Sequence, residues 1–180
     1  MRRELSSGGV VFKKLQNSKS PSSPRLRRTS KTLWLLAKSA PSKEFPRSFW
    51  RLPKGWLDDE EGGKKTGPLA RGERKATEDE IQNAALREVR EEGGVNAKII
   101  KKLGTERYFF AVNGEKILKF VTFYLMEWIE DIPEGPAFET EKVEWLDYDK
   151  ARKKLTHSGE KKILDKAKQV LDSGLQATLV

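Results

Sequence analysis

The sequence predicts a single α/β domain built around a mixed β-sheet, and three observations lead to this prediction. Short apolar runs typical of strands alternate along the chain with segments of helical periodicity. Asn113 followed by Gly114, between two β-rich runs, predicts an antiparallel hairpin, so the sheet is not purely parallel. The length of 180 residues suits one domain with a single core, and residues 1–180 are therefore interpreted as one domain.

The first part of the chain is expected to supply strands separated by long loops. Residues 5–12 are predicted to form the first strand and the apolar residues 32–38 a second, buried strand. A brief extended stretch at residues 49–52 ends at a proline. Residues 13–31 hold seven Lys or Arg and no acid among many Ser and Pro, which predicts a long loop. Residues 56–76 are rich in Gly and mixed charge, so we predict a second long loop with little apolar content for a core.

A helix with clear end signals follows these loops. Thr77 and Glu80 have the spacing of a capping box, in which Thr77 is the N-cap. Gly93 and Gly94 predict the C-terminal end. Four apolar residues recur at helical spacing and are expected to face the core: Ile81, Ala84, Ala85 and Val89.

The second half of the chain contains a predicted hairpin, a last strand and two helices. Residues 107–112 and 116–128 are the two hairpin strands, and residues 143–146 form the last strand. Residues 150–155 are compatible with a short helix. Residues 160–172 carry apolar side chains at helical spacing and predict a longer one.

Composition and charge exclude several classes of protein. The chain has no cysteine, which excludes disulfides, zinc–thiolate sites and cysteine nucleophiles. No apolar run approaches the roughly 20 residues that span a bilayer, and no signal peptide is recognised, so we expect a cytoplasmic protein. The net charge of +9 favours polyanionic partners such as phosphorylated metabolites, nucleic acid or an acidic membrane surface. The oligomeric state is not predicted.

Three glutamates are crowded into one turn of the predicted helix. Glu88, Glu91 and Glu92 stand at positions i, i+3 and i+4, so their carboxylates lie on one face and repel each other. A hard divalent cation such as Mg²⁺ prefers oxygen ligands and would remove the repulsion. Arg87 is placed to hold one of the carboxylates by a two-pronged contact. The alternative interpretation of the cluster is a solvated acidic helix face.

The wider sequence context favours the metal site. The stretches LPKG (residues 52–55) and AALREVREEGGV (residues 84–95) resemble the Nudix box: a glycine, five residues, a glutamate, seven residues, and then R-E-apolar-x-E-E-x-G-apolar. Gly55 matches the first glycine, and the second half is matched by Arg87, Glu88, Val89, Glu91, Glu92, Gly94 and Val95. Two departures exist. Asp79 stands where the family has its first glutamate, which leaves its role open, and it lies 24 positions after Gly55 instead of six, an insertion of 18 residues.

The resemblance implies a fold, a reaction and a cofactor. The implied fold is an α/β/α sandwich around a mixed β-sheet. The implied reaction is hydrolysis of a nucleoside diphosphate linked to another group, with Mg²⁺ or Mn²⁺ as the cofactor. Matched residue by residue, Glu88, Glu91 and Glu92 are the implied metal ligands. Arg87 and Glu91 are also expected to take part in catalysis, and Glu139, from a later loop, is the candidate base or further ligand, with Glu141 as second choice.

Other residues are expected to contact the substrate or to pack. Lys54 and Gly55 are expected to contact the substrate. Lys54 is placed to meet a phosphate, although a plain surface lysine is the alternative. Tyr108 could stack on a base, because an aromatic face accepts any purine. The alternative for Tyr108 is a core or surface residue of its strand, and this is the prediction for Tyr124, which could also stack on a base. His157 is predicted to be a surface residue.

The substrate class is inferred from similarity beyond the box. The stretches GEKILKFVTFYLM and FETEKVEWLDYDKARKKL are similar to bacterial diadenosine tetraphosphate (Ap4A) hydrolases, which favours dinucleoside polyphosphates such as Ap4A. The alternatives are a Nudix hydrolase acting on diphosphoinositol polyphosphates, nucleoside triphosphates or the 5′ end of RNA, and a non-catalytic protein that binds nucleic acid.

Overall fold

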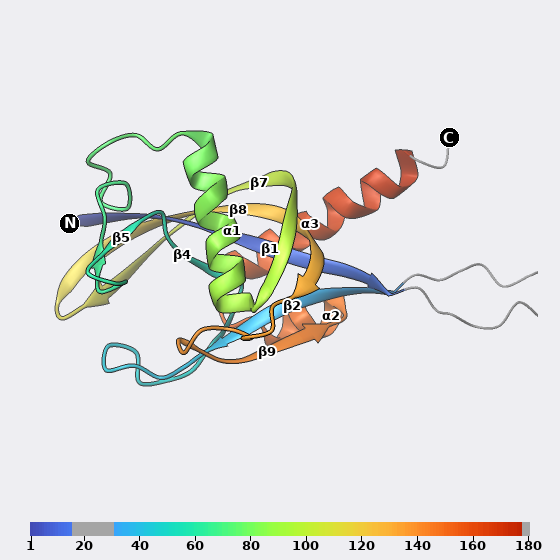
Figure 1. Ribbon diagram of the computed structural model, residues 1–180, viewed down its shortest axis with the longest axis horizontal. Helices are drawn as coiled ribbons and strands as arrows, with labels where there is room; N and C mark the ends of the chain where they lie inside the picture. The colour runs from blue at the N-terminus through green and yellow to red at the C-terminus, as the bar shows by residue number, and fades with distance from the viewer. Residues whose placement is uncertain (16–30, 178–180) are drawn as a thin grey trace, which may run out of the picture.

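The fold is built on a mixed β-sheet (Figure 1). The structure is a computed structural model, which describes residues 1–15 and 31–177. Among these residues the main sheet has seven strands: β1 (Arg2–Leu15), β2 (Lys31–Ser39), β3 (Trp50–Arg51), β4 (Lys54–Trp56), β7 (Val95–Val112), β8 (Glu115–Asp131) and β9 (Thr140–Leu146). A separate hairpin consists of β5 (Asp59–Glu60) and β6 (Lys65–Thr66). The described helices are α1 (Glu78–Gly93), α2 (Tyr148–Lys154) and α3 (Ser158–Ala177). The predicted α/β class and mixed sheet are confirmed.

Strand β1 lies in the middle of the sheet. It runs parallel to β8 and antiparallel to β2 and β4. Strands β7 and β8 form the predicted hairpin, and Asn113 and Gly114 at its turn have positive φ angles of 49° and 80°, as such tight turns require. Strand β7 begins at Val95, directly after α1, and not at residue 107 as predicted. Three register shifts interrupt its first half, so residues 95–106 do not show the regular alternation that identifies a strand.

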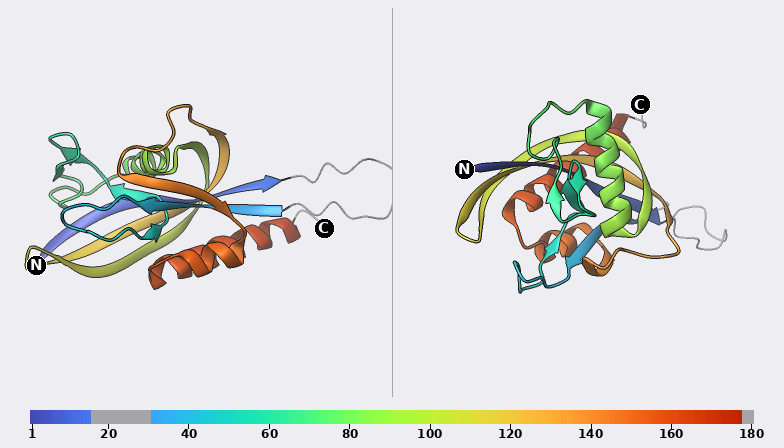
Figure 2. Two further views of the ribbon diagram at one scale, coloured as in Figure 1. Left: turned by 90° about the horizontal axis from the view of Figure 1, so that it is seen from below. Right: turned by 60° about the vertical axis from the view of Figure 1, so that its left-hand side comes forward.

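Alternate residues of the strands face two helical layers, one on each side of the sheet (Figure 2). Val10 and Phe12 pack with residues of α2 and α3, among them Leu164. Val11, between them in the sequence, packs with Val89 of α1 on the opposite face. The predicted α/β/α sandwich is therefore confirmed, and α1 is held against the sheet by its apolar stripe.

Both ends of α1 have the predicted signals. The Thr77 side chain accepts the Glu80 N–H, and the Glu80 carboxylate accepts the Thr77 N–H, which is the expected capping box. At the other end Gly94 has a φ of 66° and donates its N–H to the Arg90 carbonyl. These contacts fix the start and the end of the helix that carries the glutamates.

The segment of residues 56–76 is not the core-free loop that we predicted. Leu57 and Leu69 are buried and pack against Ala84 of α1. The Asp58 carboxylate accepts the backbone N–H groups of Leu69 and Ala70 at 3.0 and 2.7 Å. The prediction was wrong because these apolar residues stand singly among Gly and charged residues. They show no period, and only tertiary contacts bury them.

The predicted loop at residues 13–31 is shorter at both ends than expected. Residues 13–15 belong to β1 and pair with residues 31–33 of β2, so both ends of the predicted loop are strand. Residues 16–30 lie outside the described part of the chain. Within that part, no helix has the length and apolar content needed to cross a bilayer.

A substitution of Leu69 tests whether the 56–76 segment contributes to the core. Replacing Leu69 by Ala is expected to lower the free energy of unfolding by about 2–3 kcal/mol, because it leaves a cavity beside α1. Urea denaturation measures this loss. The matched change at exposed Lys64 (Lys64→Ala) is expected to stay within about 0.5 kcal/mol. Equal effects of the two substitutions would show that the segment does not contribute to the core.

Candidate metal-binding and catalytic site

Two of the three clustered glutamates are buried, and the third is exposed. Glu88 and Glu92, one helical turn apart, point from α1 toward the β3–β4 segment and are only 8% and 5% exposed. The Glu91 side chain is 52% exposed at the edge of this face. The structure therefore places the glutamates on one side of α1, as their spacing predicts, but in unequal environments.

Gly55 makes room for the Glu88 carboxylate. A Cβ atom at position 55 would lie 2.2 Å from Glu88 Oε2, far inside van der Waals contact. The glycine at the start of the Nudix pattern therefore has a packing reason here, even though it stands 24 residues before Asp79.

Arginine side chains and backbone amides hold the two buried carboxylates. Arg87 Nη2 donates to Glu88 Oε1 at 2.7 Å and to the Trp56 carbonyl at 2.6 Å, so Arg87 orients Glu88 against β4. Glu92 Oε2 accepts the Lys54 backbone N–H at 2.9 Å, and Arg51 Nη2 donates to Glu92 Oε1. The helix and the β3–β4 segment are joined through these charged groups.

Burial makes both carboxylates weaker acids. Burial raises the pKa of Glu88 to about 7, and the neighbouring Glu92 adds to this effect, whereas the bond from Arg87 opposes it. Burial also raises the pKa of Glu92 against the opposing charges of Arg51 and Lys54, and the charge of Glu139 raises it further. The site therefore holds two desolvated carboxylates whose negative charges are not fully compensated.

The donor chemistry of this site fits Mg²⁺ or Mn²⁺. Carboxylate oxygens are the ligands these ions prefer, and the uncompensated charge on Glu88 and Glu92 is what a divalent cation would stabilise. Within the described residues, no three acidic or histidine side chains converge closely enough to form a ligand set as they stand. Arg51 and Arg87 each contact one oxygen of Glu92 and Glu88, so a bound cation would share these carboxylates with the two arginines.

Lys54 does not offer a free ammonium group to a phosphate. Its Nζ lies 2.8 Å from Glu160 Oε1, and both side chains are 6% exposed. Burial lowers the pKa of Lys54, but Glu160, Tyr108 and Glu92 together outweigh this effect, so the pKa is raised and the lysine stays charged. The structure therefore places the Lys54 ammonium neither at a phosphate site nor on the open surface, the two positions that the sequence suggests, but against Glu160 of α3.

A second polar region lies on β7 and β8, where the structure places Tyr108. Tyr108 pairs with Lys119 across the hairpin and is 39% exposed. Lys119 Nζ lies 3.9 Å from Glu4 Oε2, which also accepts the Trp56 indole N–H at 2.9 Å. The pKa of Lys119 is lowered to about 8, first by burial and then by the positive charge of Lys54. Basic and aromatic groups are therefore adjacent here, within electrostatic reach of the buried carboxylates.

The other predicted residues have distinct positions. Exposed Glu139 precedes β9, close enough for its charge to act on Glu92, whereas Glu141 is paired with Lys38 at 2.8 Å. Asp79 is exposed in the first turn of α1, about 13 Å along the helix axis from Glu88. Tyr124 is buried, as predicted, and its hydroxyl donates to Glu78 Oε1 at 2.7 Å. His157 is exposed, as predicted.

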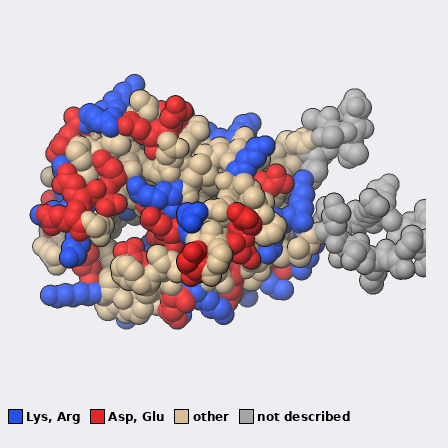
Figure 3. Space-filling view, viewed as in Figure 1, with Lys and Arg blue, Asp and Glu red and all other residues tan. Residues whose placement is uncertain are grey.

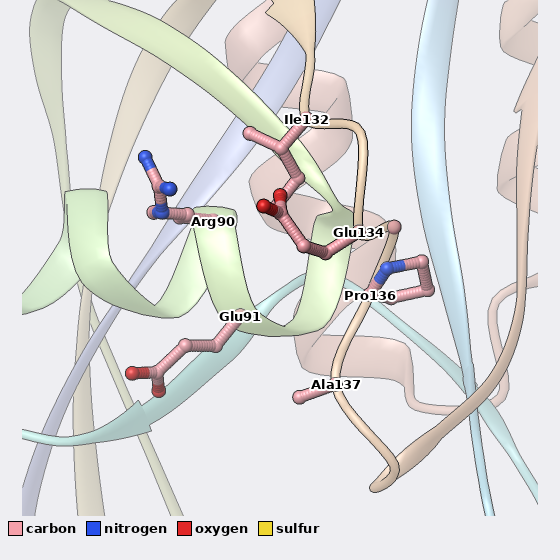
Figure 4. A pocket seen from close by; sticks show the side chains of 7 residues that line it. Arg90, Glu91, Ile132, Glu134, Pro136 and Ala137 are labelled. Atoms are coloured by element: carbon pink, nitrogen blue, oxygen red, sulfur yellow. The ribbon is translucent and has the colours of Figure 1, made fainter.

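A shallow pocket of about 360 Å³ lies beside the C-terminal end of α1, next to Glu91 (Figure 4). Its walls are the end of the helix and the loop between β8 and β9, including Ile132, Pro136 and Ala137. The Ala137 N–H donates to the Glu91 carbonyl at 2.6 Å and holds this loop on the helix. The pocket is lined mainly by apolar surface and does not contain Glu88 or Glu92.

Comparison with known proteins identifies the family. The model of the NUDIX domain matches residues 24–167, which is more than half of the chain, and the chain therefore belongs to the NUDIX domain family. A sequence relative is the Mycobacterium tuberculosis (strain CDC 1551 / Oshkosh) protein called "Putative mutator protein MutT4", which is 25% identical over 126 residues. The match covers 70% of this chain and 44% of that protein, so this chain spans less than half of the relative's length.

Solved structures share the fold. A NUDIX hydrolase from Nitrosomonas europaea superposes with a TM-score of 0.57 at 15% identity, covering 92% of this chain and 88% of that one. A C. elegans Ap4A hydrolase in a binary complex superposes with a TM-score of 0.55 at 17% identity, covering 94% and 98%. At these identities the similarity shows the architecture, which agrees with the family.

The raised pKa of Glu88 predicts a dependence of stability on pH. The folded state binds a proton that the unfolded state releases between about pH 4.5 and 7, so the free energy of unfolding is expected to fall as the pH rises through this window. The loss is about 3 kcal/mol in metal-free buffer. Urea denaturation at pH 5 and pH 8 measures it. In Glu88→Gln this part of the pH dependence of the free energy of unfolding should disappear. If the free energy of unfolding changed with pH in the variant as it does in the unmodified protein, Glu88 would ionise normally.

Proposed function

We propose that this chain is a metal-dependent Nudix pyrophosphohydrolase, which cleaves a phosphoanhydride bond with Mg²⁺ or Mn²⁺ as the cofactor. The observation that carries this proposal is the pair of buried carboxylates on the helix of the Nudix box: Glu88, which lies against Gly55, and Glu92, which accepts the Lys54 backbone N–H. An inactive relative would have no reason to keep this repulsive pair out of water. Membership of the NUDIX domain family and the hydrolases among the solved structures support the proposal.

The residues of the chain divide the work of the proposed reaction. The cation would be held by Glu88, Glu91 and Glu92. When bound, it would neutralise negative charge on the phosphates and lower the pKa of a bound water. Arg87 fixes the direction of Glu88, and Gly55 lets the carboxylate approach the backbone of β4. Glu139 is our candidate for the group that accepts a proton from the attacking water, because it is solvent-accessible and close to Glu92.

We propose a dinucleoside polyphosphate such as Ap4A as the substrate. The similarity of residues 114–126 and 138–155 to bacterial Ap4A hydrolases supports this choice. So does the position of partly exposed Tyr108, because an aromatic face can stack on a base. On the face seen in Figure 3, basic and acidic side chains are intermingled, so the described residues there form no continuous basic track for nucleic acid.

A panel of substrates tests the reaction and the substrate together. The purified protein is incubated with Mg²⁺ and Ap4A, a nucleoside triphosphate, a diphosphoinositol polyphosphate or 5′-triphosphorylated RNA, and the products are identified by mass. We expect Ap4A to be cleaved to two nucleotides with the highest kcat/KM. Faster cleavage of another compound would reassign the substrate within the same reaction. No metal-dependent cleavage of any of them, together with tight and salt-sensitive binding of nucleic acid, would favour a non-catalytic protein.

Two isosteric substitutions in α1 test the metal ligands. Glu92→Gln keeps the shape of the side chain but removes its charge, and it is expected to lower metal-dependent turnover by about 100-fold or more with little loss of stability. Asp79→Asn in the same helix is the matched control and should stay within about threefold of the unmodified protein, because Asp79 is far from the buried pair. Steady-state kinetics at several Mg²⁺ concentrations measure both. A large effect of Asp79→Asn with a small effect of Glu92→Gln would mean that the ligands are misassigned.

A further inference from the structure

We propose that Glu160 is a positioning residue of this site. Its carboxylate neutralises the Lys54 ammonium and so keeps Glu92 available to a divalent cation. This inference rests on the proposed function, because it assumes that Glu92 binds a metal. Nothing in the Nudix box pattern contains Glu160, which lies in the first turn of α3 on the other side of the sheet from α1.

The segment of residues 52–54 is held by two glutamates that lie on different helices. Glu92 of α1 accepts the backbone N–H of Lys54 at 2.9 Å. Glu160 of α3 accepts the backbone N–H of Leu52 at 2.7 Å and also contacts the Lys54 ammonium at 2.8 Å. Lys54 thus has its backbone on one carboxylate and its side-chain charge on the other.

The division of Lys54 between the two carboxylates has an electrostatic consequence. Glu92 already contacts the Arg51 guanidinium through Oε1. If Glu160 did not neutralise the Lys54 ammonium, the positive charges of Lys54 and Arg51 would both act on Glu92, and a metal ion would have to compete with both. An additional unit charge within several ångströms, at the effective dielectric constant of a partly buried site, corresponds to a change in cation affinity of about tenfold or more.

The pairing with Glu160 is not needed to anchor the segment itself. The Trp50 carbonyl accepts the Thr156 N–H at 3.1 Å, and the Trp50 N–H donates to Thr156 Oγ1 at 3.1 Å. The Pro53 carbonyl accepts the Gly9 N–H at 3.0 Å. These bonds do not involve Glu160, and a glutamine at position 160 could still accept the Leu52 N–H. The charge of Glu160 can therefore be removed while the backbone stays held.

The test measures Mn²⁺ binding directly, by the electron paramagnetic resonance signal of the free ion, so that it does not depend on a substrate. In Glu160→Gln we expect the Kd for Mn²⁺ to rise about tenfold or more, because the positive charge of Lys54 near Glu92 is no longer neutralised. In the double variant Glu160→Gln/Lys54→Met the Kd should return to within about threefold of the unmodified protein, because the competing charge is gone. Glu144→Gln is the control, because Glu144 also loses a lysine partner, Lys154, but lies outside the site.

The possible results are distinct. An unchanged Kd in Glu160→Gln, or a double variant that binds as weakly as the single one, would overturn the positioning role, since a purely structural contact is not repaired by removing Lys54. If Glu160→Gln does not fold, the double variant decides alone: recovery of the Kd supports the role, and weak binding overturns it. If the unmodified protein binds no Mn²⁺, the proposed function fails first, and this inference fails with it.

Discussion

The site depends on one electrostatic constraint: two carboxylates, Glu88 and Glu92, are kept out of water one helical turn apart. Removing such charges from water costs several kcal/mol each unless other groups compensate them. Arg87 and Arg51 supply part of the compensation, and the Lys54 backbone N–H supplies another part. This compensation is incomplete, because burial still raises the pKa of both groups. A divalent cation is the simplest partner that completes the balance.

The fold brings three distant parts of the chain together around the two carboxylates: α1, β4 and α3. The apolar stripe of α1 fixes the helix on the sheet, and the capping contacts of Thr77 and Gly94 fix its length. Strand β4 presents Gly55 to the helix, and α3 contributes Glu160 from the other layer. The segment before α1 also packs on the helix through Leu69. Architecture and site are therefore coupled, since the core residues of both layers determine where the charged groups meet.

Local signals explain what could be predicted from the sequence. The mixed sheet, the hairpin at Asn113, the ends of α1 and the shared face of the glutamates follow from spacing and turn chemistry, which act over a few residues. The contacts of Lys54, Lys119 and Glu160 could not be predicted, because their partners are far away in the sequence. For Lys119 the sequence does contain one local indication of burial. Lys119 alternates in phase with three inward-facing residues of β8, where a charge is unexpected: Val121, Phe123 and Leu125. The buried residues of the 56–76 segment have no such local pattern in the sequence.

The central claim is that Glu88 and Glu92 exist to hold a divalent cation that in turn engages a polyphosphate. Crystals grown with Mn²⁺ and a non-hydrolysable Ap4A analogue, and measured at a wavelength where manganese scatters anomalously, test this claim most directly. The account predicts an anomalous peak within coordination distance of carboxylate oxygens of Glu88 and Glu92, with analogue phosphate oxygens on its other side. A map with the analogue bound but no anomalous peak beside this turn of α1 would contradict it.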